Sequence, residues 1–160
     1  MEFDKVIRER KATRKFSDKI LEREKIDKIL EAGRLAPTAK NMQPFKIYVV
    51  QSKEGITKID KATKCRYGAP VVLLVCGDKD KSYVKDNLPM YQMDASIVTT
   101  HMMLEATNLG VDNIWIELSD KLNFPKETIG EDPFEYIKEL MKTADIKYYL
   151  IILYILLIGK

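Results

Sequence analysis

Hydrophobic residues recur with the period of an α-helix in three parts of the chain. Apolar side chains at every third or fourth position, with charged side chains between them, are typical of a helix that packs one face against a core. The stretch from Pro89 to Leu109 differs, because its apolar residues cover more than one narrow stripe and Gly110 follows as a natural C-cap. We therefore expect that helix to be buried on most of its circumference. The predicted helices cover residues 1–9, 22–35 and 89–109, with a shorter one at 55–62.

Compact apolar runs predict the strands. Val71–Cys76 is almost continuously apolar, which predicts a strand covered on both faces at the centre of a sheet. Shorter runs rich in β-branched and aromatic residues predict strands at 46–51 and 113–117. In the second of these, Trp115 packs over a ring or fills the core, and we favour the core. The polar stretch Gly77–Leu88 has no clear period, which predicts a loop.

The longest apolar run lies near the C-terminal end of the sequence. Tyr148–Ile158 has 11 consecutive apolar residues, well short of the roughly 20 residues that a membrane-spanning helix needs. A run of this length would promote aggregation if it were exposed. We therefore favour a buried strand, and a membrane-surface or partner-binding tail is the alternative.

Composition narrows the class of protein. With 160 residues and 46% hydrophobic content, the chain fits one domain with an α+β or α/β layered fold. Its 27 basic and 24 acidic residues leave a formal charge of +3, too small for bulk electrostatics to favour a nucleic-acid partner. Cys65 and Cys76 are not spaced as a Cys-x-x-Cys pair and the charged N-terminus has no apolar leader, so we expect a cytoplasmic location.

His101, the single histidine, has no partner at a metal-ligand spacing, so we expect a structural role and no metal site.

Two stretches carry candidate chemistry. Ala36–Phe45 contains two prolines, which exclude a helix interior and a central strand. Its polar side chains Thr38, Asn41 and Gln43 could read the edge of a planar polar ligand, and a plain helix-to-strand connection is the alternative. Arg8–Lys15 concentrates positive charge, and an arginine can hold a phosphate through two parallel hydrogen bonds. A solvated charged face is the alternative there.

Both stretches resemble motifs of one family. Arg10–Phe16, read R-K-A-T-R-K-F, resembles the R-R-S-x-R-K-F opening of the nitroreductase family, and Ala36–Phe45 resembles that family's A-P-S-x-x-N-x-Q-P-W block. Asp94–Trp115 resembles the central helix and following strand of the family. The match is clear for residues 1–117, and the C-terminal part diverges. The resemblance implies one FMN-binding domain over residues 1–160, with an α+β fold of three layers: a central mixed, mainly antiparallel sheet flanked by helices, and a buried central helix.

The resemblance also implies a homodimer that holds each FMN in a groove at the subunit interface. Arg10, Lys11 and Arg14 would hold the FMN phosphate and ribityl chain, while Ala12 stands at the place of a family serine and removes one hydroxyl contact. The partner subunit would line the isoalloxazine ring, and Thr38 keeps the hydroxyl of the family's serine there. The implied ring-lining residues are Pro37, Thr38, Ala39, Asn41 and Gln43.

Ile116 and Glu117 match a segment whose backbone approaches the flavin in the family. The implied reaction is ping-pong: NADH or NADPH gives a hydride to FMN, and an electron-poor small molecule such as a nitroaromatic or quinone accepts it. We expect no catalytic acid or base from the protein, because the flavin carries the chemistry. Two other interpretations remain, a flavin-binding protein with little turnover and a non-enzymatic binder of an anionic partner through Arg8–Lys15. We expect neither a nucleic acid nor a membrane as a partner in the leading interpretation.

Overall fold

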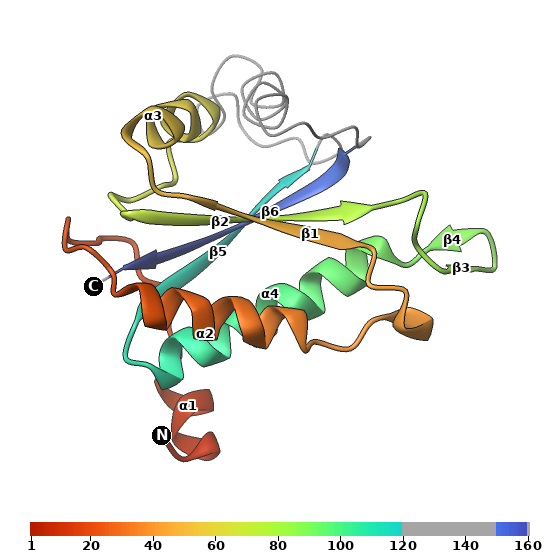
Figure 1. Cartoon of the computed structure of the whole chain (residues 1–160), viewed down its shortest axis with the longest axis horizontal. Helices are drawn as coiled ribbons and strands as arrows, with labels where there is room; N and C mark the ends of the chain where they lie inside the picture. The colour runs from red at the N-terminus through yellow and green to blue at the C-terminus, as the bar shows by residue number, and fades with distance from the viewer. Residues whose placement is uncertain (120–149, 160) are drawn as a thin grey trace.

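A four-stranded sheet with helices on both faces forms the centre of the molecule (Figure 1). The structure is a computed structural model that describes residues 1–119 and 150–159. The helices are α1 (Phe3–Glu9), α2 (Arg23–Arg34), α3 (Lys53–Ala62) and α4 (Tyr91–Asn108), with a 3-10 turn at Ala39–Asn41. The strands are β1 (Phe45–Val50), β2 (Val71–Asp78), β3 (Val84–Lys85), β4 (Leu88–Pro89), β5 (Asp112–Ser119) and β6 (Leu150–Gly159).

The strand order of the main sheet is β1-β2-β6-β5, and every neighbouring pair of strands is antiparallel. The one parallel pairing described is an isolated bridge between Ala12 and Asn113. β2 pairs on both sides, which confirms the prediction of a central strand. β6 lies between β2 and β5, and its Leu157 stands opposite Val72 on one side and Ile114 on the other. The prediction of a buried strand is therefore confirmed for residues 150–158, the described part of the C-terminal apolar run, and the alternative of a membrane-surface or partner-binding tail is wrong.

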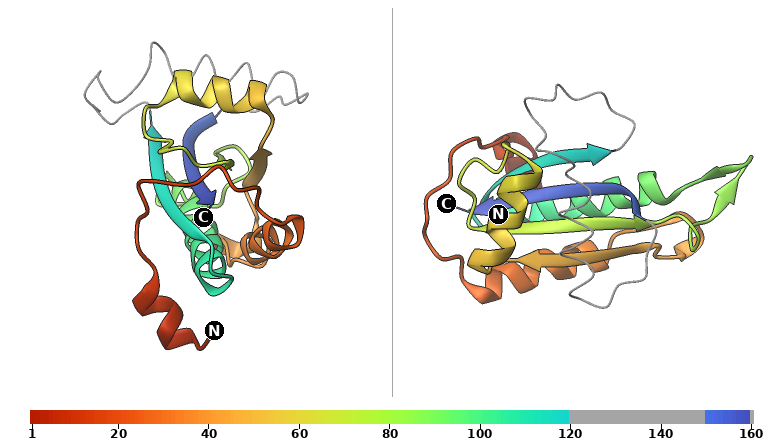
Figure 2. Two further views of the ribbon diagram at one scale, coloured as in Figure 1. Left: turned by 90° about the vertical axis from the view of Figure 1, so that its left-hand side faces the viewer. Right: turned by 90° about the horizontal axis from the view of Figure 1, so that it is seen from above.

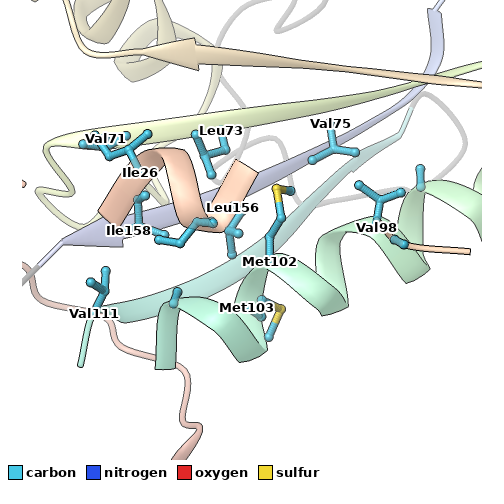
Figure 3. Packing of buried hydrophobic residues seen from close by; sticks show 14 of the residues in the cluster. Ile26, Val71, Leu73, Val75, Val98, Met102, Met103, Val111, Leu156 and Ile158 are labelled. Atoms are coloured by element: carbon cyan, nitrogen blue, oxygen red, sulfur yellow. The ribbon is translucent and has the colours of Figure 1, made fainter. Parts of the chain in front are cut away.

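Side chains of successive strand residues point to opposite faces of the sheet, and this alternation builds two cores. On one face, Val71, Leu73 and Val75 of β2 pack with α2 and α4, in the cluster shown in Figure 3. On the other face, Val72 and Leu74 pack with residues that include Ile59 of α3. Figure 2 shows α3 on one side of the sheet and α2 and α4 on the other. The predicted three-layer α+β fold is confirmed.

The helix α4 is buried around most of its circumference, as the sequence predicts. Val98, Met102 and Ala106 have no exposed surface, and Asp94 and Thr107 are also buried. A helix that is apolar on nearly all sides needs neighbours on nearly all sides. The sheet covers one side of α4, and α2 packs along another.

The segment between β2 and α4 is more ordered than predicted. β2 continues to Asp78, and β3 and β4 form a hairpin that projects from the end of the sheet (Figure 1). Asp86 and Asn87 connect its two strands, with φ of 52° and 64°. Positive φ at both central residues is typical of a type I′ turn, which matches the twist of a hairpin. The prediction of a plain loop over Gly77–Leu88 is therefore wrong.

The structure describes two side chains that the sequence singled out. Trp115 on β5 is 37% exposed, so it does not fill the core as we favoured. The structure leaves His101 half-buried on α4, and no group of His, Cys, Asp and Glu suited to a metal ion occurs in the described part of the chain. Among the helices that the structure describes, none is both long enough and apolar enough to cross a membrane.

The position of β6 inside the sheet yields a test of the fold. Replacing the fully buried Leu157 by alanine removes packing on both neighbouring strands, and we expect the free energy of unfolding to fall by about 2–5 kcal/mol. Val49→Ala on the edge strand β1 is the control, because Val49 is 39% exposed, and its cost should be about 1 kcal/mol or less. Denaturant unfolding measures both. An equal loss for the two variants would contradict the placement of β6.

Candidate functional site

The basic segment after α1 is held against the start of β5. Ala12 forms the bridge to Asn113, and the backbone N–H of Thr13 donates a hydrogen bond to the Asn113 carbonyl at 3.0 Å. The Thr13 hydroxyl donates to the Asp112 carboxylate at 3.2 Å. Further on, the buried ring of Phe16 fixes the segment in the core beside α3. We call Arg10–Phe16 the basic strip, and its backbone is ordered by these contacts.

The cations of the basic strip differ from those of the helices in their partners. On α1 and α2, Arg8, Arg23 and Arg34 each pair with a carboxylate three or four residues away, at 2.6–2.8 Å. Within the described residues, no ion pair involves Arg10, Lys11, Arg14 or Lys15. An ordered backbone that presents cations without a carboxylate partner is suited to binding an anion, and a phosphate can take several of the donors at once.

Tyr67 stands behind the basic strip. Its hydrogen bond to Cys65 and its burial raise the pKa of the Tyr67 hydroxyl, while Arg14, which also shares a hydrogen bond with it, pulls that pKa down. The hydroxyl therefore stays protonated at neutral pH. The Tyr67 carbonyl also accepts the N–H of Phe16 at 3.1 Å. The Tyr67 carbonyl thus holds the end of the strip, and its side chain lies beside Arg14, a proximity that the sequence alone did not reveal.

The polar segment after α2 forms the shaped loop that its prolines predict. We call Pro37–Gln43 the ring loop. The Thr38 hydroxyl oxygen accepts the backbone N–H of Gln43 at 2.9 Å, which closes the loop on itself. Lys40, Asn41 and Gln43 have φ of 53°, 55° and 50°, and non-glycine residues in this left-handed region cost on the order of 1–2 kcal/mol each. The side chains of Asn41 and Gln43 are exposed, so both amides are available to a ligand or a partner.

Two neighbours hold the ring loop in this conformation. The N–H of Ala39 donates to Oδ1 of Asp94, in the first turn of α4, at 2.8 Å. At the other end, the N–H of Asp78 donates to the Pro44 carbonyl at 2.7 Å. Asp94 is only 1% exposed. Asp94 is not among the site residues predicted from the sequence, where its only signal is an acidic residue near the start of a long helix.

The structure separates the two predicted parts of the site within one chain. The basic strip is bridged to Asn113, just beyond the C-terminal end of α4, whereas the ring loop is bonded to Asp94 near its N-terminal end. α4 has 18 residues, so its ends lie about 27 Å apart. Figures 1 and 2 show the strip and the loop at opposite ends of the molecule. Of the other predicted residues, Ile116 and Glu117 lie on β5, the strand beside the strip.

Two pockets open near α1, away from the ring loop. One of about 300 Å³ is lined by Glu9 and Lys11 and by the turn from α4 into β5. The other, of about 430 Å³, is lined mainly by α1 and α4, including His101. Neither is lined by a ring-loop residue. These pockets do not join the two predicted parts of the site.

Comparison with known proteins agrees with the fold and with the motifs. Residues 7–67 match the family model described as "Nitroreductase family". An Archaeoglobus fulgidus protein named "Putative NADH dehydrogenase/NAD(P)H nitroreductase" is 31% identical over 132 residues, which is 79% of this chain and 75% of that protein. The chain belongs to the nitroreductase family.

Solved structures extend the likeness over nearly the whole chain. A nitroreductase family protein from Clostridium difficile 630 has 36% sequence identity and a TM-score of 0.81, over 99% of this chain and 84% of that one. An FMN-dependent nitroreductase from Clostridium difficile R20291 has 30% identity and a TM-score of 0.72, over 96% of this chain and 84% of that one. The family fold therefore includes β6, where the sequence motifs are no longer recognisable.

Proposed function

We propose that the chain is an FMN-dependent oxidoreductase that carries a hydride from NADH or NADPH to an electron-poor acceptor such as a nitroaromatic or quinone. The observation that carries the proposal is the basic strip, whose ordered backbone presents cations without ion-pair partners among the described residues. The FMN-dependent relative at 30% identity supports the choice of cofactor. Both cysteines are free thiols, in keeping with a proposed cytoplasmic location.

In this proposal the strip holds the FMN phosphate and ribityl chain. Arg10, Lys11 and Arg14 supply the charged donors, and the Tyr67 hydroxyl lies beside Arg14. Ala12 supplies only its backbone there. The neighbouring hydroxyl of Thr13 does not replace the missing one, because it donates to Asp112. We therefore assign phosphate binding to charge rather than to hydroxyl contacts.

The ring loop of a second chain lines the isoalloxazine ring. Asn41 and Gln43 offer exposed amide groups, and Pro37 and Ala39 offer small apolar surfaces. The oxygen of Thr38 accepts the Gln43 N–H, which leaves the proton of its hydroxyl free to donate. Ile116 and Glu117 complete the ring site through their backbone on β5.

The separation of the strip and the loop supports a homodimer. Since the two lie near opposite ends of α4, a twofold axis can bring the strip of one chain to the loop of the other, and it does so twice. Exposed apolar side chains are available for such an interface. Phe3 on α1 is 70% exposed, and Met93 on α4 is 59% exposed. The proposed dimer has two identical flavin sites.

When bound, FMN supplies ping-pong redox chemistry, in which it takes a hydride from the nicotinamide and returns the electrons to the acceptor. The protein binds and orients the participants. Its cations neutralise the phosphate, its amides fix the plane of the ring, and the dimer interface excludes water from one face of the site. No side chain is assigned as a general acid or base.

The binding of an anionic partner without flavin is the competing function. Fewer cations support this function in the structure than in the sequence. Arg8 pairs with Asp4 at 2.8 Å, so it is not among the cations that lack a carboxylate partner. A flavin-binding protein with little turnover is the other alternative. Measurements of flavin binding and of nicotinamide oxidation distinguish these two alternatives from the oxidoreductase.

The oxidoreductase proposal predicts a specific spectroscopic result. Protein supplied with FMN and freed of the excess should retain a flavin absorption band, and anaerobic NADH or NADPH should bleach it. A quinone or nitroaromatic should then restore the band. Retained flavin that neither nicotinamide reduces would favour the protein with little turnover. Absence of retained flavin, with salt-sensitive binding to a polyanion instead, would favour the anion-binding function.

The shared site predicts complementation between two defective chains. Arg14→Gln weakens the strip and Asn41→Ala weakens the ring loop, so each variant alone should bind FMN at least about tenfold more weakly, a loss of about 1.4 kcal/mol. In mixed dimers one site combines both defects and the other has neither. Co-expression of the two should restore tight binding at about a quarter of all sites, because half of randomly formed dimers are mixed.

The control for this experiment is Arg23→Gln, which removes an equal charge from α2, where Arg23 pairs with Asp27. Its FMN affinity should stay within about twofold of the wild type, since an exposed ion pair contributes little. FMN titration followed by flavin fluorescence measures every variant. Co-expressed chains that show no tight sites would contradict a site built from two chains.

A further inference from the structure

The two oxygens of the Asp94 carboxylate differ in their contacts. Oδ1 accepts the N–H of Ala39 at 2.8 Å, whereas Oδ2 is buried and has no hydrogen-bond partner in the described part of the chain. A buried carboxylate with one unpartnered oxygen is unfavourable for stability, and an apolar residue of similar size would often serve a core better. The core packing of α4 therefore does not explain an aspartate at this position.

The hydrogen bond of Asp94 goes to the ring loop and not to its own helix. The first turn of α4 has backbone N–H groups that an acidic side chain often caps, yet the described partner of Asp94 is the N–H of Ala39, 55 residues away in sequence. The carboxylate thus joins the buried helix of the core to a segment on the surface. A hydrogen bond of this kind fixes the direction of the donor.

The loop needs such a restraint. Three of its residues, Lys40, Asn41 and Gln43, have left-handed backbone conformations, which are less favourable for residues with a side chain than for glycine. Such conformations persist only where the surroundings determine them. The Thr38–Gln43 bond closes the loop internally, and the Asp78–Pro44 bond holds its far end. The bond from Asp94 to Ala39 holds the near end, directly before the first left-handed residue.

We propose that Asp94 is the positioning residue of the ring loop: its carboxylate fixes the Ala39 peptide, and so presents the amides of Asn41 and Gln43 to the flavin held by the partner chain. The inference rests on the proposed FMN site. Asp94 itself does not contact the flavin, because it is buried behind the loop. Its effect on the cofactor passes through the backbone conformation of the loop.

Three variants test this role. Asp94→Ala removes the acceptor, whereas Asp94→Asn keeps an amide oxygen that can accept the Ala39 N–H. Val98→Ala is the matched control, since Val98 lies one turn further along the buried side of α4 and its loss creates a cavity in a hydrophobic cluster that contains no ring-loop residue. Amide hydrogen exchange at Ala39 in the flavin-free protein, FMN affinity, and the absorption spectrum of bound FMN are measured for each variant.

We expect Asp94→Ala to speed exchange at Ala39 and to weaken FMN binding at least about tenfold, a change of about 1.4 kcal/mol, with an altered flavin spectrum. Asp94→Asn should stay within about threefold of wild-type affinity. Val98→Ala should lower the melting temperature but leave the exchange at Ala39, the affinity and the spectrum unchanged.

Wild-type FMN affinity and an unchanged flavin spectrum in Asp94→Ala would overturn the role of Asp94 but not the proposed function. Equal weakening by Asp94→Ala and Val98→Ala would also overturn it, because the role would then be general stability. A wild-type protein that binds no FMN would overturn the proposed function and this inference together, so the two failures are distinguishable.

Discussion

Burial of α4 is the constraint on which the rest of the structure depends. Its apolar residues face the sheet on one side and α2 on another, with Met102 and Val98 fully enclosed. A helix this apolar has no stable position at a surface. Its two ends are thereby fixed in space, and each end carries half of the proposed site. Asp94 holds the ring loop at one end, and the turn at Gly110 leads into the strand that bridges the basic strip at the other.

This arrangement relates stability to function in a simple way. The strip and the loop are each ordered by backbone hydrogen bonds and by buried anchors such as Phe16, so their polar side chains remain available for binding. The helical cations pair with nearby carboxylates, while those of the strip have no such partners among the described residues. Cations that lack a carboxylate partner but remain in water lower the stability of the fold little, and they can bind a phosphate. The length of α4 then favours a site completed by a second chain.

Local pattern predicted much of the fold, and contacts distant in sequence account for most of what it missed. Val71–Cys76 and the helix before Gly110 were identifiable because unbroken apolar runs and multi-sided helical stripes have few other solutions. The position of β6 between β2 and β5 could not be identified from the sequence, because β2 and β6 pair across about 80 residues of chain. The sequence Asp86-Asn87 is itself a hairpin signal, because both residue types tolerate the positive φ that a type I′ turn needs, so this part of the prediction failed on turn chemistry. For the site, the motifs located both segments, but neither Asp94 nor Tyr67 could be assigned, since their partners lie on other elements.

The central claim is that the flavin site exists only between two chains. Native mass spectrometry of the protein with FMN, over a dilution series that dissociates the dimer, tests it most directly. We predict that FMN is carried by dimers, at two per dimer, that monomers carry none, and that added FMN raises the dimer fraction at a given dilution. Monomers that each retain one FMN would contradict the account.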